Sequence, residues 1–169
     1  MKKIIQLLIS SLLLVIVQVI LFNHLSVYYF ATPIVYLYPL LKLPISANRQ
    51  LQIFLAAVLG FVVDLFMNTP GLNMACSALV MYWRTPLLLK LANTDEEEVM
   101  NAPPSFKTLS VFNYLLYLFV VVVLHIACIY LLEAFSVRLY VGVLPYIAGS
   151  SVFTLLLYVV FDAFMYKTS

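Results

Sequence analysis

The chain has 169 residues, of which 65% are hydrophobic and only 9% are charged, with a formal net charge of +2 and a mean hydropathy of +1.09. Soluble domains carry about 25% charged residues, so this chain lacks the polar side chains needed to cover a surface facing water. The composition therefore predicts an all-α, polytopic integral membrane protein. It leaves no room for an extramembrane catalytic, nucleotide-binding or nucleic-acid-binding domain.

Six apolar runs divide the chain, which we treat as a single membrane domain of residues 1–169. A membrane-spanning helix needs about 20 apolar residues, and the predicted spans are 4–22, 27–43, 51–67, 72–91, 111–132 and 142–165. The second run is the least regular, because Pro33 and Pro39 interrupt it and Pro44 closes it. Proline removes a backbone donor and kinks a helix, so this run can be broken, short or re-entrant.

The distribution of lysine and arginine predicts the orientation, since these residues favour cytoplasmic loops. If all six runs cross, only Arg138 of the 9 basic residues lies outside, and the others are inside: Lys2, Lys3, Lys42, Arg49, Arg84, Lys90, Lys107 and Lys167. Both termini and loop 92–110 are then cytoplasmic, and the turn 68–71 faces outward. We interpret the acidic cluster 95–98 as a solvated loop, with a docking patch for a basic cytosolic partner as the alternative.

Asp64 is the most informative single residue, because it lies thirteen positions past Leu51 in the third predicted span, about 20 Å from the cytoplasmic end. A carboxylate at that depth costs several kcal/mol unless it is paired, hydrogen-bonded, protonated or wet. One interpretation is an ion, proton or substrate site. The favoured interpretation is structural: the carboxylate ties the third span to a neighbouring helix or caps the turn Asn68–Gly71.

Arg84 and Asp162 lie at similar depths in the fourth and sixth predicted spans. Their positions predict an intramembrane ion pair that joins these two spans. His125 lies alone in the fifth span, where a lone histidine is more often a hydrogen-bonded core residue than a ligand. Cys76 and Cys128 both fall within apolar runs and are interpreted as small core residues.

No nucleotide-binding, hydrolase or metalloprotease motif occurs in the chain. No set of His, Cys and carboxylate residues has the spacing of a metal site either. The sequence therefore predicts a non-enzymatic protein with no cofactor and no metal.

The stretch 60–73 resembles the signature region of the rod shape-determining protein MreD family. Members have a glycine followed by an aspartate at the end of a span, a short turn with glycine, and a further apolar span. The matching residues are Gly60, Asp64, Gly71 and Leu72. The length, the six-span hydropathy and the proline-interrupted second span are also similar to that family. The longer acidic loop 92–110 departs from it, so no cytoplasmic contact site is transferred to those residues.

The resemblance implies a non-enzymatic inner-membrane subunit of the bacterial cell-elongation machinery. Its implied partners are the periplasmic scaffold protein MreC, the actin-like MreB, the polymerase RodA with its transpeptidase partner, and the lipid bilayer. We expect such a subunit to bind a partner through helix faces and short loops. The candidate residues for structure or partner contact are Gly60, Asp64, Asn68, Gly71 and Asn73.

Two rival interpretations remain. The family's fold also resembles the substrate-binding subunits of energy-coupling-factor vitamin transporters, which implies a small-molecule transport subunit with Asp64 and His125 lining a central cavity. A membrane-embedded enzyme ranks last, because no pair of catalytic groups at a suitable spacing supports it.

Overall fold

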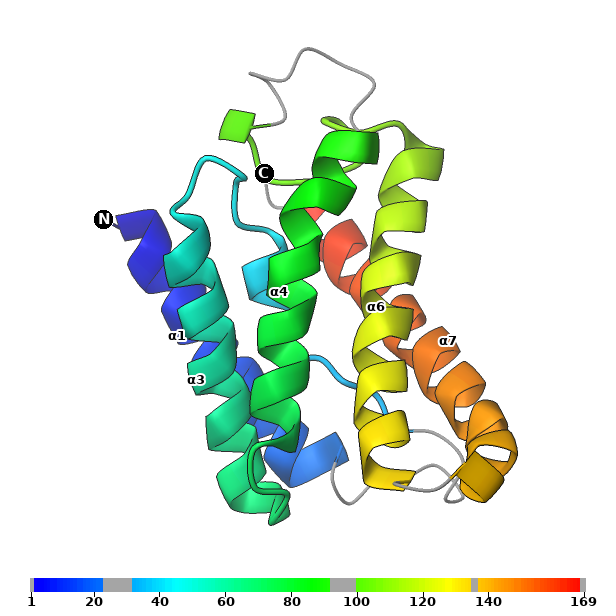
Figure 1. The fold of residues 1–169 in the computed structure, drawn as a ribbon. Helices are drawn as coiled ribbons and strands as arrows, with labels where there is room; N and C mark the ends of the chain where they lie inside the picture. The colour runs from blue at the N-terminus through cyan, green and yellow to red at the C-terminus, as the bar shows by residue number, and fades with distance from the viewer. Residues whose placement is uncertain (1, 23–31, 92–99, 135–136, 168–169) are drawn as a thin grey trace.

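A computed structural model describes residues 2–22, 32–91, 100–134 and 137–167 of the chain. These ranges contain helices and no strand, which confirms the predicted all-α class. The elements are α1 (Lys2–Val17), continued by the π-helix η1 (Gln18–Phe22), then α2 (Tyr38–Leu41), α3 (Arg49–Met67), α4 (Leu72–Leu91), α6 (Val111–Ala134) and α7 (Val137–Lys167) (Figure 1).

Three helical stretches in the described ranges are long and apolar enough to cross a membrane: Arg49–Met67, Val111–Glu133 and Gly142–Phe164. Their length and composition are consistent with the predicted helical membrane protein. The first helix contains a shorter apolar run, Ile9–Ile20. Helix α4 has the predicted bounds, 72–91. It is not one of these three stretches, and it carries the buried polar residues Asn73, Ser77 and Arg84.

The helices run up and down the molecule. Helices α3, α4 and α6 are successive neighbours, and α7 packs on α6 while crossing it at a steep tilt (Figure 1). The beginning of α1 and the end of α7 lie at the same end of the molecule, as expected for an even number of crossings. The acidic cluster 95–98 lies outside the described residues.

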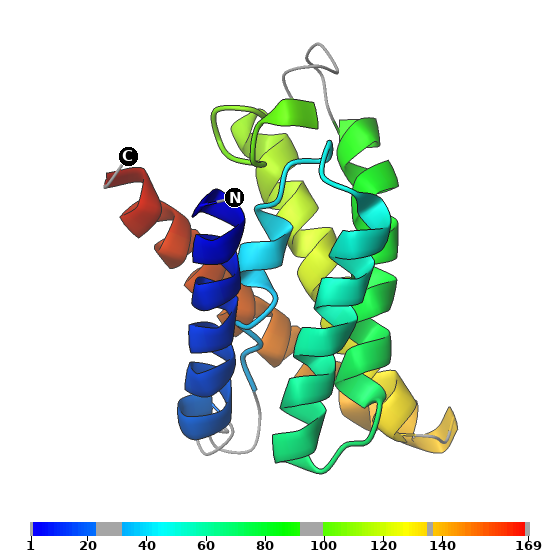
Figure 2. The same cartoon turned by 90° about the vertical axis from the view of Figure 1, so that its left-hand side faces the viewer.

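The second predicted span, 27–43, is not a helix over the residues that the structure describes. Residues 32–35 have no regular secondary structure, residues 36–37 form a turn, and only Tyr38–Leu41 is helical. Pro33 and Pro39 supply no backbone N–H, which explains why a continuous helix does not form. The segment nevertheless runs lengthwise through the molecule between α1 and the other helices (Figures 1 and 2).

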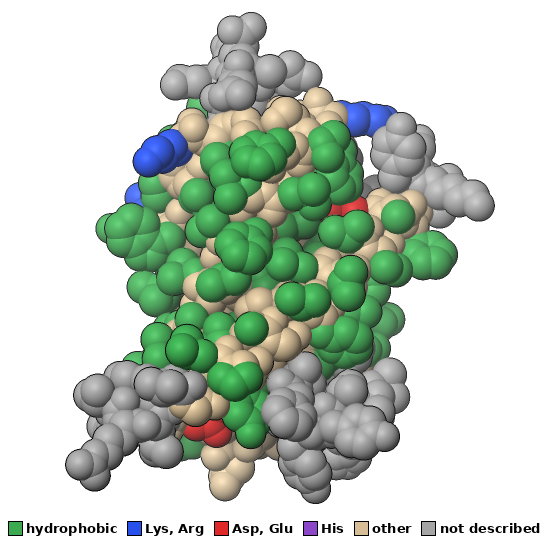
Figure 3. Space-filling model, turned by 90° about the vertical axis from the view of Figure 1, so that its right-hand side faces the viewer, with side chains coloured by type: hydrophobic (Ala, Val, Ile, Leu, Met, Phe, Trp, Pro, Cys, Tyr) green, Lys and Arg blue, Asp and Glu red, His purple; other side chains and the backbone are tan. Residues whose placement is uncertain are grey.

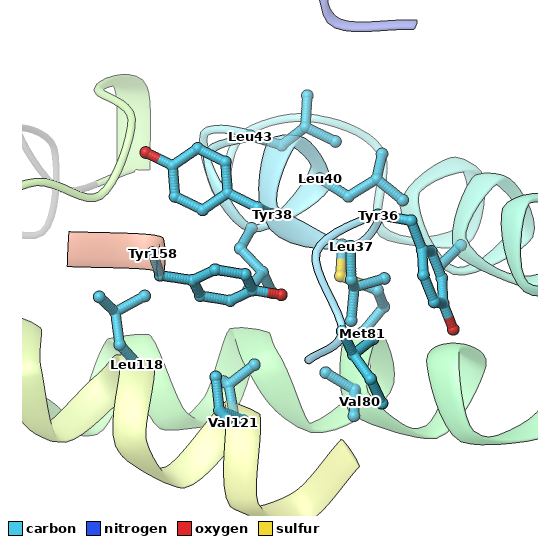
Figure 4. Packing of buried hydrophobic residues seen from close by; sticks show 14 of the residues in the cluster. Tyr36, Leu37, Tyr38, Leu40, Leu43, Val80, Met81, Leu118, Val121 and Tyr158 are labelled. Atoms are coloured by element: carbon cyan, nitrogen blue, oxygen red, sulfur yellow. The ribbon is translucent and has the colours of Figure 1, made fainter. Parts of the chain in front are cut away.

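This irregular segment, residues 32–43, forms the centre of the core. Its side chains pack against α4, α6 and α7, and the residues that meet in Figure 4 are Tyr36, Leu37, Tyr38, Leu40, Leu43, Val80, Met81, Leu118, Val121 and Tyr158. Val35 and Leu40 have no exposed surface. Non-helical backbone is tolerated at membrane depth only when protein covers it, and the surrounding helices provide that cover.

The outer helix faces are apolar. Large hydrophobic side chains are exposed on all the long helices, and Figure 3 shows them spread over one side of the molecule with few charged groups between them. Such faces suit a hydrocarbon environment.

Candidate functional site

Asp64 joins the end of α3 to the start of α4. Its carbonyl oxygen accepts the backbone N–H of Asn68, the left-handed residue that ends α3, and that of Thr69 at 3.3 Å. Its carboxylate caps the next helix: Oδ1 accepts the Asn73 N–H at 2.9 Å and Oδ2 accepts the Met74 N–H at 3.0 Å. The first N–H groups of a helix have no partner within the helix and attract negative charge. The favoured structural interpretation of this buried carboxylate is therefore confirmed.

Four further residues of the predicted polar cluster shape the same hairpin. Asn68 and Gly71 have positive φ angles of 56° and 82°, which the tight turn requires. Gly60 lets the helices approach closely, because a Cβ atom there would lie 2.5 Å from the carbonyl oxygen of Asn73. The Asn73 side-chain amide donates to Asp64 Oδ1 at 2.9 Å. All five predicted residues thus belong to one structural unit.

A chain of buried polar groups leads from this hairpin into the core. Asn73 Oδ1 accepts from the Tyr36 hydroxyl at 3.4 Å, and the same hydroxyl lies 2.8 Å from Ser77 Oγ and 3.2 Å from His125 Nε2. His125 is therefore a hydrogen-bonded core residue, as predicted. Asp64 and His125 are connected through these hydrogen-bonded groups. Asp64 also lines a hollow beside the α3–α4 turn, and His125 is not among the residues that line it.

The predicted ion pair between Arg84 and Asp162 is wrong. Arg84, which has no exposed surface, donates from Nη1 to Gln52 Oε1 at 2.8 Å and from Nε to the Tyr117 hydroxyl at 3.1 Å. Its Nη2 donates to the carbonyl oxygens of Leu41 and Leu43. Since the second span is not a helix, its free carbonyl groups take the place that a carboxylate would otherwise fill.

Asp162 pairs instead with Lys42. It also accepts hydrogen bonds from the hydroxyls of Tyr38 and Tyr114, each at 2.5 Å. The Lys42 ammonium donates to the Pro104 carbonyl oxygen at 3.1 Å. This cluster fastens the end of the irregular segment to α6 and α7. Arg84 and Asp162, which were predicted to pair with each other, therefore each bind the irregular segment through separate contacts.

Other polar side chains hold the beginning of the irregular segment. Gln18 accepts from the Val35 N–H and donates to the Pro33 carbonyl oxygen, both at 2.9 Å. From α7, Thr154 Oγ1 accepts the Ile34 N–H at 3.1 Å. Sequence reasoning missed these residues, although an isolated glutamine within an apolar run was a usable signal.

The two cysteines face each other between α4 and α6. The Sγ atoms of Cys76 and Cys128 lie 2.8 Å apart, and both thiols are free. The prediction that they are core residues holds for Cys76, which is buried, while Cys128 is half-buried. Their proximity was not expected from the sequence.

The described residues contain no group of three or more His, Cys, Asp or Glu side chains that could hold a metal ion. The buried polar groups described above bind one another, the backbone of the irregular segment or the start of α4. These contacts therefore join the irregular segment to the helices around it.

Comparisons with protein-family models, with curated proteins and with solved structures give no match to this chain.

Proposed function

We propose that this protein is a non-enzymatic subunit of the bacterial cell-elongation machinery, similar to the MreD family, and that it supports peptidoglycan synthesis by binding other membrane proteins. The α3–α4 hairpin is the observation that carries the proposal. Gly60, Asp64 and Gly71, the residues of the family resemblance, have three complementary roles in that hairpin: close helix contact, helix capping and a left-handed turn.

The proposed arrangement is a bacterial inner-membrane protein with six crossings, of which the second is the irregular segment 32–43. Both termini and loop 92–110 would be cytoplasmic, and the turn 68–71 would face the periplasm. The position of α1's beginning and α7's end on one side of the fold supports an even number of crossings (Figure 1). The proposed main partner is an MreC-like periplasmic scaffold, with MreB, RodA and its transpeptidase as further members of the complex.

A binding role is supported by the way the buried polar groups are used. Arg84, Asp162 and Lys42 each bind several neighbours within the fold. The exposed helix faces, in contrast, offer extensive apolar surface for contact with other membrane helices. In lipid, such contacts depend on close packing and on a few polar groups.

The test is a gentle-detergent purification of the tagged full chain from its native membrane, followed by identification of the co-purified proteins. We expect a single-span periplasmic coiled-coil scaffold and peptidoglycan synthases, and loss of rod shape when the chain is depleted. Recovery of a cytoplasmic ATPase pair with a coupling membrane subunit, together with a bound vitamin, would instead establish the rival transport function.

A further inference from the structure

A hollow of about 390 Å³ lies beside the α3–α4 turn. Its apolar walls include Phe61, Leu65 and Met74, and its polar lining includes Asp64 and Asn68. The Asp64 side chain is therefore both a helix cap and part of the wall of a surface hollow. The hollow has room for the end of a long side chain from another molecule.

The charge of Asp64 is only partly offset within the described residues. Oδ1 accepts three hydrogen bonds, from Thr69 Oγ1 and from the two nitrogens of Asn73, whereas Oδ2 accepts one, from Met74. All of these donors are neutral, and the helix N-terminus contributes about half a positive charge. A carboxylate offers about four acceptor positions over its two oxygens, so Oδ2 retains capacity for a further donor.

An exposed apolar stripe on α3 leads to this hollow. The α3 stripe consists of Leu51, Phe54, Val58, Phe61 and Leu65, which are 48%, 63%, 41%, 47% and 66% exposed. Their spacing alternates between three and four residues, the pattern by which one helix receives another along its length. Helix α3 lies on the side of the molecule that faces the viewer in Figure 2. The last two residues of the stripe also line the hollow.

We propose that the α3 stripe and the hollow dock a membrane-spanning helix of a partner protein, whose Lys or Arg side chain enters the hollow and donates to Asp64. Lipid tails could cover the stripe, but they offer no donor to the carboxylate. A basic side chain offers both an aliphatic stem for Phe61, Leu65 and Met74 and a cationic end for Asp64. This inference rests on the proposed function as a partner-binding subunit.

Site-specific photocrosslinking in native membranes tests the docking site. Benzoylphenylalanine is placed at Leu65 of the full chain, and at Phe119 of α6 as a matched exposed control. We expect Leu65 to crosslink about tenfold more than Phe119 to a membrane-spanning peptide that contains Lys or Arg. Equal yields at the two positions, attachment to lipid alone, no crosslink, or a peptide without a basic residue would each overturn the proposal.

The charge contact is tested in the partner, so that the fold of this chain is not disturbed. The basic residue of the crosslinked peptide is changed to glutamine, and the crosslinking yield at Leu65 is measured again. A fall of about tenfold or more supports a contact with Asp64. An unchanged yield excludes it.

The outcomes separate this inference from the proposed function. Co-purification with the periplasmic scaffold, without a Leu65 crosslink to a membrane helix, would overturn the docking site and leave the elongation role standing. A Leu65 crosslink to a basic membrane helix of a protein outside the elongation machinery would overturn that role and leave the docking site standing.

Discussion

Asn73 donates two hydrogen bonds to Asp64, one from its backbone N–H and one from its side-chain amide, both to Oδ1 at 2.9 Å. The pair fixes the first turn of α4 against the last turn of α3. Asp64 is only 2% exposed, so these bonds lie almost entirely inside the protein.

Replacement of Asp64 by alanine should therefore destabilise the protein by about 3–5 kcal/mol, since it leaves buried donors at the start of α4 without an acceptor. The measurement is the free energy of unfolding in detergent micelles. Glu133→Gln is the control, because Glu133 is an exposed carboxylate on α6 and its replacement should change stability by less than about 0.5 kcal/mol. Equal effects of the two substitutions would contradict the capping role.

Replacement of Gly60 by alanine should destabilise the protein by about 1–3 kcal/mol through overpacking. The added Cβ would lie 2.5 Å from the backbone oxygen of Asn73, so α3 and α4 would have to move apart. The matched control is Gly142→Ala, since a Cβ at Gly142 meets nothing within 4 Å. Thermal unfolding of the purified variants measures both effects, and equal stability of the two variants would show that the helices do not approach as described.

Two double-mutant cycles should separate the observed ion pair from the one predicted by the sequence. Lys42→Met and Asp162→Asn should couple by about 0.5–3 kcal/mol, because these side chains form a direct pair. Arg84→Met and Asp162→Asn should be additive within about 0.5 kcal/mol, because Arg84 binds Gln52, Tyr117 and backbone carbonyls instead. Unfolding free energies of the single and double variants provide the values, and the reverse pattern of coupling would restore the original ion pair.

Treatment of the membranes with copper phenanthroline should convert Cys76 and Cys128 to a disulfide that joins α4 and α6. The two sulfur atoms lie 2.8 Å apart, so little side-chain movement is needed. Mass spectrometry of peptides alkylated under denaturing conditions should find both thiols blocked, and a reductant should release them. In the Cys128→Ser variant, Cys76 should remain free for alkylation. Two reactive thiols after oxidation of the unaltered protein would argue against the packing of α4 on α6.

Several features could be read directly from the sequence. The bounds of α4 were predicted to the residue, and those of α3 and α6 to within two residues. The role of Asp64 at the hairpin was also predictable, because its partners Asn68, Thr69 and Asn73 follow within nine positions. Hydrophobic run length and local turn chemistry are properties of neighbouring residues, so the sequence alone determines them.

The irregular segment and its partners were decided by the tertiary structure. Prolines indicated that the second span would be broken, but they did not indicate which side chains would satisfy its backbone. The backbone of the segment forms hydrogen bonds with Gln18 of the first helix, Arg84 of α4 and Thr154 of α7. Thr154 is 120 residues away from the N–H that it accepts. A buried polar group takes whichever partner the packed helices place beside it, and that depends on lateral packing between distant parts of the chain. For the same reason, Asp162 is not the partner of Arg84, although the two residues lie at similar depths in their predicted spans.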